Sequence, residues 1–218
     1  MNGRNAGDAG ETALRLNALL CGAGQLPLER KTANQFVDYL SLLMHWNDRI
    51  NLSAVRDEEG ILSRHFVESI VVARKLPKEI HTLLDFGSGA GLPGIPIALC
   101  RPEIAVTLAE SQAKKAAFLR EAVRRLGTST KVHAGRAEAL RVVFDCVTLR
   151  AVDRMTKAVA EAVGLLEPGG WLALMTTGAE VGRLQHAAGE EIAWGNSQAL
   201  PRGNDRILVM GKRRRSGS

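Results

Sequence analysis

The sequence is poor in aromatic residues and in cysteine, and it holds no long apolar run. Aromatic side chains make up only 4% of the residues, which disfavours a protein that stacks single-stranded nucleic acid on aromatic platforms. The three cysteines, Cys21, Cys100 and Cys146, form no CxxC pair, so neither a zinc motif nor a disulfide scaffold is predicted. No apolar stretch approaches the roughly 18 residues that span a bilayer, and no signal-peptide pattern is evident. These absences favour a cytoplasmic protein without a membrane segment.

The composition is otherwise typical of a globular chain. Apolar residues are 45% and charged residues 24% of the 218 residues, a length that suits one domain with an extension. The net charge is 29 − 23 = +6, and four of these positive charges belong to residues 212–215. We therefore separate residues 212–218 as a basic tail. Such a tail either neutralises phosphates or forms a solvated end, and the sequence leaves both interpretations open.

Residues 1–80 read as a helical extension packed on the core. An amphipathic segment starts near residue 12 with Leu14, Ala18 and Leu19, and it ends at residues 22–24, which hold two glycines. Two further stretches place apolar residues at helical spacing: Phe36, Leu40, Leu43 and Met44, then Leu62, Phe66, Ile70 and Ala73. No strand pattern interrupts these stretches.

After residue 80, short apolar runs alternate with helical stretches. Strands are predicted at residues 82–86, 104–109, 130–134, 145–149, 171–176 and 206–210. Helices are predicted up to residue 100, over 111–126 with Ser111 as N-cap, over 154–166 and near 180–190. Residues 168–170 read as a turn. The alternation predicts an α/β fold with a doubly wound, mostly parallel sheet, whose core spans residues 81–211.

The most informative segment is the glycine-rich loop that follows the first predicted strand. Its frame Asp85-x-Gly87-x-Gly89-x-Gly91 starts where the strand stops and is typical of loops that bind S-adenosylmethionine (SAM). The frame Gly89-x-Gly91-x-x-Gly94 matches the dinucleotide fingerprint but starts two residues after the strand. SAM is favoured over a nicotinamide cofactor, and a tight turn capped by Asp85 is the remaining alternative.

Glu110 ends the second predicted strand, 23 residues after Gly87. A carboxylate at this place accepts hydrogen bonds from ribose hydroxyls in either class of cofactor. Glu110 therefore supports a nucleoside ligand without choosing between SAM and a nicotinamide. An exposed acid in the first turn of a helix is the alternative.

Six segments, which occur along the chain in the same order as in a specific family, resemble that family. They are the glycine loop, Trp46-Asn47 with Asn51-Leu52-Ser53, residues 64–69, residues 110–119, Arg136-Ala137-Glu138, and Arg150-Ala151-Val152. Together they resemble the bacterial small-subunit rRNA guanine-N7 methyltransferases (RsmG, also called GidB), over residues 40–175. The resemblance implies a Rossmann-like class I methyltransferase that acts on 16S rRNA or the 30S particle, at a guanine of the decoding-region loop. A monomer is the default expectation, because no spare apolar patch is evident in the sequence. Thr177 stands where the family usually has lysine.

The resemblance also implies roles for single residues. Gly87 and Leu92 would line the methionine and ribose side of SAM, and Glu110 would hold the ribose. The other cofactor-binding residues of the loop are Asp85, Gly89 and Gly91, and the acidic strand end suits the ammonium of SAM. Ala137 and Glu138 would contact the adenine, and Arg150 would lie at the mouth of the pocket as an orienting group. Lys114 and Lys115 would hold rRNA phosphates or form a solvated helix face.

Guanine N7 attacks with a free lone pair and loses no proton, so we expect no catalytic general base. No metal is expected either, because neither the cysteines nor the histidines show metal-ligand spacing. Alignment of N7 with the methyl group would supply most of the catalysis. The five histidines lack metal-ligand spacing, and only His65, inside a family-like segment, merits a test. Two other functions remain open: a nicotinamide-dependent oxidoreductase and a non-enzymatic basic RNA-binding module.

Overall fold

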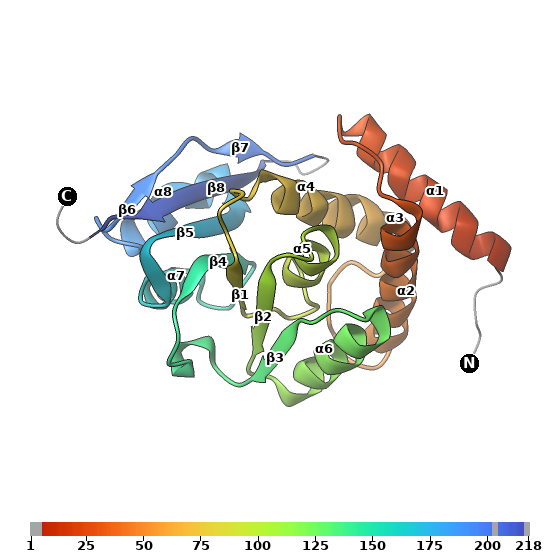
Figure 1. Ribbon diagram of the computed structural model, residues 1–218, viewed down its shortest axis with the longest axis horizontal. Helices are drawn as coiled ribbons and strands as arrows, with labels where there is room; N and C mark the ends of the chain where they lie inside the picture. The colour runs from red at the N-terminus through yellow and green to blue at the C-terminus, as the bar shows by residue number, and fades with distance from the viewer. Residues whose placement is uncertain (1–5, 202–204, 216–218) are drawn as a thin grey trace.

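Eight strands form one mixed sheet in a computed structural model that describes residues 6–201 and 205–215 (Figure 1). They are β1 (Thr82–Phe86), β2 (Ala105–Glu110), β3 (Lys131–Ala134), β4 (Phe144–Arg150), β5 (Leu166–Thr177), β6 (Ile192–Trp194), β7 (Gln198–Ala199) and β8 (Arg206–Arg213). The order is β3-β2-β1-β4-β5-β8-β6, with β7 also paired to β8. Strands β1 to β5 are parallel, whereas β8 runs antiparallel to β5. The predicted doubly wound α/β fold is confirmed.

The central strands β1 and β4 bury both of their faces, because consecutive side chains point to opposite sides of the sheet and nearly all of them are buried. In β1, Leu83 belongs to one apolar cluster and Leu84 to the other, and both are fully buried. Two-sided burial explains why the parallel strands read as short unbroken apolar runs. The chain leaves β1 toward β2 and β3 and then returns to β4 on the other side of β1, so the ends of β1 and β4 flank the switch point where ligands bind in such sheets.

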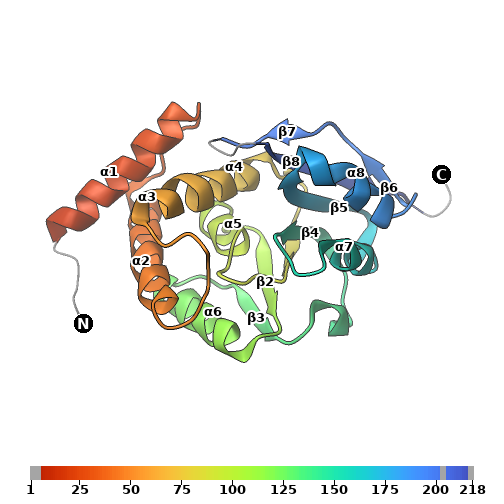
Figure 2. The same ribbon diagram turned by 180° about the vertical axis from the view of Figure 1, so that it is seen from behind.

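Helices cover both faces of the sheet. They are α1 (Ala6–Gly22), α2 (Arg30–Asn47), α3 (Glu58–Gly60), the π-helix η1 (Ile61–Val67), α4 (Glu68–Lys75), α5 (Gly94–Cys100), α6 (Ala113–Leu126), the 3-10 turn η2 (Ala137–Ala139), α7 (Met155–Val163) and α8 (Gly178–Ala187). Helices α1, α2, α4, α5 and α6 share one cluster with the sheet, while α7 and α8 pack on the opposite face (Figure 2). None of the described helices is long and apolar enough to span a membrane.

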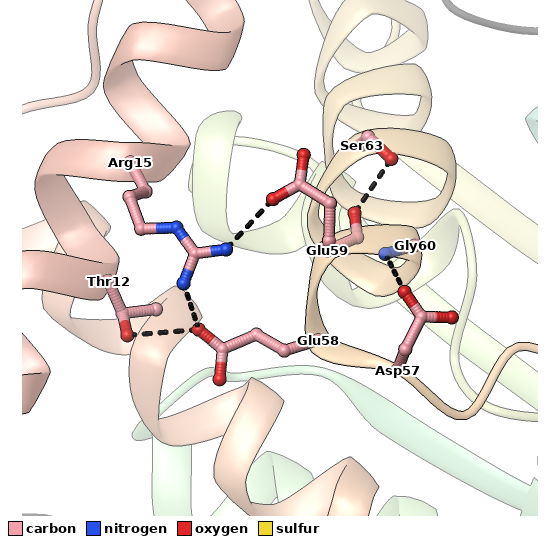
Figure 3. A network of polar contacts seen from close by, with 7 residues as sticks. All are labelled: Thr12, Arg15, Asp57, Glu58, Glu59, Gly60 and Ser63. Atoms are coloured by element: carbon pink, nitrogen blue, oxygen red, sulfur yellow. Dashed lines mark hydrogen bonds and ion pairs between the residues drawn. The ribbon is translucent and has the colours of Figure 1, made fainter.

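Helix α1 packs on α2 and η1 through buried leucines, and its ion pairs with α3 are shown in Figure 3. The Arg15 guanidinium lies 3.1 Å from a Glu58 carboxylate oxygen and 2.8 Å from one of Glu59. Leu16 and Leu20 are fully buried. Leu14, with which the predicted amphipathic segment begins, is 72% exposed and does not lie on the buried face of α1. The leucines that pack inward, Leu16 and Leu20, are spaced four residues apart, and the first of them lies two positions after Leu14.

Several predicted boundaries also differ from the structure. Helix α1 starts at Ala6 rather than near residue 12. Residues 168–170 are not a turn between elements but lie inside β5, where the register against β4 shifts and Gly169 adopts a positive φ. Strands β6 and β7 were not predicted, because each is only two or three residues long.

The basic tail starts later than predicted. Strand β8 continues through Arg213, so the first two residues of the run 212–215 belong to the sheet. The Lys212 ammonium lies over the Trp171 ring, and Arg213 pairs with Glu191 and donates to the Leu166 carbonyl. Antiparallel pairing with β5 and β6 thus fixes residues that charge alone marked as a tail. Residues 216–218 lie outside the described part of the chain.

Candidate active site

Two adjoining pockets open at the carboxyl ends of β1, β2 and β4. The larger, about 530 Å³, is called here the loop pocket, and its wall includes Ser53, Gly89, Leu92, Glu110 and Arg150. The smaller, about 300 Å³, is called the η2 pocket, and it includes Ala137 and Glu138. Both share Gly87, Ser111, Val152 and Asp153, so they form one continuous cleft. This place is where an open parallel sheet binds its ligand.

The glycine loop turns sharply between β1 and α5. Gly87, Gly89 and Gly91 all have positive φ, a region that side chains disfavour. A Cβ on Gly91 would lie 2.5 Å from the Ile95 side chain, while one on Gly89 would meet only open space beyond the loop backbone. Gly91 is therefore required for packing against the protein, whereas Gly89 leaves room on the ligand side. The structure does not bring Gly91 to the wall of either pocket.

Asp85 supports the loop from behind. Its carboxylate is 1% exposed, accepts a hydrogen bond from the Thr148 hydroxyl at 2.9 Å and accepts another from the Gly94 backbone N–H at 3.2 Å. Burial raises the pKa of Asp85 to about 6, although those hydrogen bonds oppose the shift. Neither pocket is lined by Asp85, so the structure gives it a positioning place rather than direct contact with a ligand.

Glu110 joins the end of β2 to the glycine loop. Its Oε2 accepts the Gly89 N–H at 2.9 Å, and its Oε1 accepts the Gln112 N–H at 2.7 Å. The second bond satisfies a backbone amide at the start of α6. The prediction that Ser111 is the N-cap of this helix is wrong, because Gln112 holds that position. Each carboxylate oxygen has a further lone pair, and Glu110 lines the loop pocket, so it can accept a ligand hydroxyl there.

Ala137 and Glu138 form the far wall of the cleft, on η2 after β3. Ala137 is buried, and the Glu138 carboxylate pairs with the exposed Arg136 at 3.2 Å. The η2 pocket also contains Phe86 and Ala109, which give it an apolar floor. Such a slot suits a flat aromatic group with polar edges, as an adenine has.

Arg150 is buried at the end of β4 and is not a surface residue. Its guanidinium donates to the Ser69 hydroxyl, the Arg64 carbonyl and His65 Nδ1, and it pairs with Glu68 at 3.3 Å. The Glu68 carboxylate is fully buried and also pairs with Arg206 at 3.1 Å. Burial lowers the pKa of Arg150 to about 10, with Glu68 opposing that shift, so it stays charged at neutral pH. The family-like residues 64–69 thus enclose the strand end.

Two parts of this site were not predicted from the sequence. The buried Asn47 side chain holds the following loop: Oδ1 accepts the N–H groups of Leu52 and Ser53, and Nδ2 donates to the Ser53 carbonyl. Arg206 lines the loop pocket although its strand was read only as the last strand of the sheet. The family-like motif with Trp46, Asn47 and Ser53 was the sequence signal for this loop, but no role could be predicted for its residues.

Lys114, Lys115 and Thr177 were singled out in the sequence as residues that could affect RNA binding. Lys115 lines the loop pocket, whereas Lys114 lines neither pocket. Thr177, in place of a family lysine, ends β5 and also lines neither pocket. Within the described ranges, no group of three or more His, Cys, Asp or Glu side chains is placed to hold a metal ion.

Comparison with known proteins connects this cleft to a family. The family model described as "rRNA small subunit methyltransferase G" matches residues 32–193. A protein of that name from Xanthomonas campestris is 41% identical over 161 residues, covering 72% of this chain and 75% of that protein. One from Neisseria meningitidis is 39% identical over 175 residues, covering 78% and 84%.

Solved structures agree on the fold. A methyltransferase from Pyrococcus furiosus superposes with a TM-score of 0.60 at 13% identity, covering 80% of this chain and 98% of that one. At this identity the likeness supports the architecture alone. Since the family model and relatives near 40% identity cover about three quarters of the sequence, the chain belongs to the rRNA small subunit methyltransferase G family.

Proposed function

We propose that this protein transfers the methyl group of SAM to N7 of a guanine in the decoding-region loop of 16S rRNA. The observation that carries the proposal is Glu110, a carboxylate with free lone pairs, hydrogen-bonded to the glycine loop inside a cleft at the switch point of the sheet. Family membership supports the same reaction. The nicotinamide alternative fits less well, because its frame requires Gly94, which is enclosed by Leu108 and Asp85 and faces neither pocket.

The residues of the cleft fit SAM. Open space above Gly89 leaves room for the ligand, Glu110 can accept the ribose hydroxyls, and the η2 pocket suits the adenine. SAM would supply an electrophilic methyl group on a sulfonium, which is already a good leaving group. The protein then has to position the base, exclude water and balance charge.

No residue of this chain is assigned as a general base, because N7 attacks with a lone pair that carries no proton. The methylated base is a cation, and unpaired positive charge beside it would raise the barrier. Glu68 offsets the charge of Arg150 behind the pocket, and Glu110 and Asp153 add carboxylates to the wall. We therefore assign Arg150 to orienting the pocket wall rather than to stacking on the base.

Basic residues around the cleft suit an RNA partner. Lys115 and Arg206 line the loop pocket, and Arg154 and Lys157 line the η2 pocket. We propose that these side chains contact phosphates of the rRNA, either free or in the 30S particle. A monomer acting in the cytoplasm is the simplest form consistent with this role.

The proposal is tested by methyl transfer from labelled SAM to 16S rRNA that lacks the modification, both free and in 30S particles. Strand cleavage at 7-methylguanine locates the product. One labelled guanine in the decoding-region loop is the expected result. SAM binding without transfer to either substrate would overturn the substrate, and absence of SAM binding would overturn the enzyme class.

A further inference from the structure

A chain of hydrogen bonds runs from Arg150 through His65 to Ser53 at the wall of the loop pocket. Arg150 Nη2 lies 2.9 Å from His65 Nδ1, and His65 Nε2 lies 2.6 Å from Ser53 Oγ. A guanidinium can only donate, so Nδ1 must be the acceptor and must carry no proton. Burial, followed by the charges of Arg150 and Arg206, lowers the pKa of His65 to about 3, so the ring is neutral. The single ring proton is therefore on Nε2 and is donated to Ser53.

The Ser53 hydroxyl oxygen receives a second hydrogen bond from inside the protein. The Val55 backbone N–H donates to it at 3.1 Å. A hydroxyl has two acceptor sites and one proton, so both acceptor sites are occupied by these donors. In the part of the chain that the structure describes, both contacts of this oxygen are donors, and its own proton is left for the pocket.

The position of Ser53 is fixed by its backbone. Asn47 accepts from the Ser53 N–H at 3.0 Å and donates to the Ser53 carbonyl at 3.1 Å. Asn47 is itself buried at the end of α2. Ser53 thus presents a preorganised neutral donor to the same pocket that Gly87, Leu92 and Glu110 line.

We infer that the Ser53 hydroxyl donates to O6 of the target guanine and selects guanine over adenine, an assignment that rests on the proposed function. Guanine presents two adjacent acceptors, N7 and O6, whereas adenine presents N7 beside an amino donor. N7 must stay free for the methyl group, so O6 is the neighbouring atom at which the base can be identified. An adenine would place its amino group against the Ser53 donor.

A neutral donor suits this reaction better than the cations nearby. A Lys115 ammonium or Arg206 guanidinium at O6 would place positive charge next to a base that becomes cationic when N7 is methylated. A hydroxyl identifies O6 without adding net charge. This difference favours Ser53 over the two cations for contact with the base and leaves them for phosphates.

The test removes the donor and the acceptor separately. Wild-type protein and Ser53→Ala are compared on rRNA that carries either guanine or 2-aminopurine at the target position; 2-aminopurine keeps N7 and the 2-amino group but lacks O6. The wild type should lose about tenfold more kcat/KM than the variant when O6 is removed, the value of one hydrogen bond. Any change in the intrinsic reactivity of N7 affects both proteins equally and cancels.

Two control variants and one binding measurement complete the test. Ser53→Thr, which keeps the hydroxyl, should retain the discrimination, and Ser63→Ala should leave it unchanged, because the Ser63 hydroxyl bonds to the Glu59 carbonyl instead. Equal losses in wild type and Ser53→Ala would overturn the assignment. So would weaker SAM binding by Ser53→Ala, since the hydroxyl would then contact the cofactor. A wild type inactive on guanine rRNA would overturn the proposed function itself.

Discussion

At the scale of the residue, two carboxylates at neighbouring strand ends have different environments and therefore different roles. Asp85 is enclosed and bonded to Thr148 and Gly94, which makes it part of the loop's support. Glu110 bonds to the loop and also faces the loop pocket. The difference predicts that substitution of Glu110 affects ligand binding, whereas substitution of Asp85 affects stability.

Glu110→Gln should weaken SAM binding by about tenfold or more. An amide has one acceptor oxygen, so it cannot accept the Gly89 and Gln112 N–H groups and a ribose as well. Isothermal titration calorimetry measures the dissociation constant. Glu180→Gln, which alters a surface ion pair with Arg183 and lines neither pocket, is the matched control and should leave it unchanged. Equal effects of the two substitutions would contradict this role of Glu110.

Asp85→Asn should change how stability depends on pH. The pKa of Asp85 is raised to about 6 in the folded state, whereas it is near 4 in the unfolded chain. The contribution of Asp85 to the free energy of unfolding is therefore fully present below pH 4 and is lost as the pH rises through 6. The loss amounts to at most about 3 kcal/mol. His65, whose pKa is lowered to about 3, acts in the opposite direction, losing stability as pH falls below about 6.5.

Urea unfolding of wild type and Asp85→Asn at several pH values separates these effects. His65 is common to both proteins, so the difference between them isolates Asp85. The variant should gain on the wild type between pH 4 and pH 6. A constant difference over that range would mean that the Asp85 carboxyl titrates normally.

The residues of the site were predictable to the extent that local spacing places them. Gly87, Glu110 and Ala137 follow strand ends in sequence, and strand ends converge in a parallel sheet. The environment of Arg150 was not predictable in this way, because its partners Glu68 and Ser69 come from a helix about 80 residues earlier. Arg150 is enclosed rather than exposed because residues distant in the sequence pack against the end of β4.

At the scale of the element, α1 illustrates the relative weight of apolar packing and surface charge. Leu16 is fully buried against the neighbouring helices, while the ion pairs of Arg15 with Glu58 and Glu59 lie at the surface (Figure 3). Exposed ion pairs contribute little, because water and side-chain entropy offset them. Packing should therefore dominate the attachment of α1.

Leu16→Ala should reduce the free energy of unfolding by about 2–5 kcal/mol, since it removes buried apolar volume. Arg15→Ala should reduce it by no more than about 1 kcal/mol. Chemical denaturation midpoints compare the two variants with wild type. A larger loss for Arg15→Ala would show that the charged contacts hold the helix.

Long amphipathic elements were predicted better than short or irregular ones. The apolar spacing around Phe36 and Leu40 correctly marked the buried face of α2. In α1 the spacing was ambiguous, because leucines occur on several faces and only packing against α2 and η1 selects Leu16 and Leu20. Strand β5 starts earlier than predicted, since pairing with β4 overrides the turn signal of residues 168–170.

At the scale of the whole molecule, the net charge of +6 should make RNA binding depend on salt. Deletion of residues 214–218 removes Arg214 and Arg215 but keeps β8 intact. It should lower the slope of log K against log salt by about 1–2 if both side chains contact phosphates. It should lower the midpoint of thermal unfolding less than deletion of the strand residues does, because the Arg214 N–H donates to the Glu191 carbonyl outside β8.

Deletion of residues 212–218 should also destabilise the protein, because Lys212 and Arg213 pair within the sheet. Filter binding at several salt concentrations and thermal unfolding of both truncations distinguish the roles. A salt slope unchanged in the shorter deletion would show that Arg214 and Arg215 do not contact phosphates. Equal stability of the two truncations would contradict the structural place of residues 212 and 213.

The central claim is that the cleft methylates guanine at N7. The most direct measurement is methyl transfer from labelled SAM to two 16S rRNAs that differ only at the target position, one with guanine and one with 7-deazaguanine, which has carbon in place of N7. We expect one label per guanine RNA and none on the 7-deaza RNA at that position. Equal labelling of both RNAs would contradict it, because the methyl group would then be going to another atom.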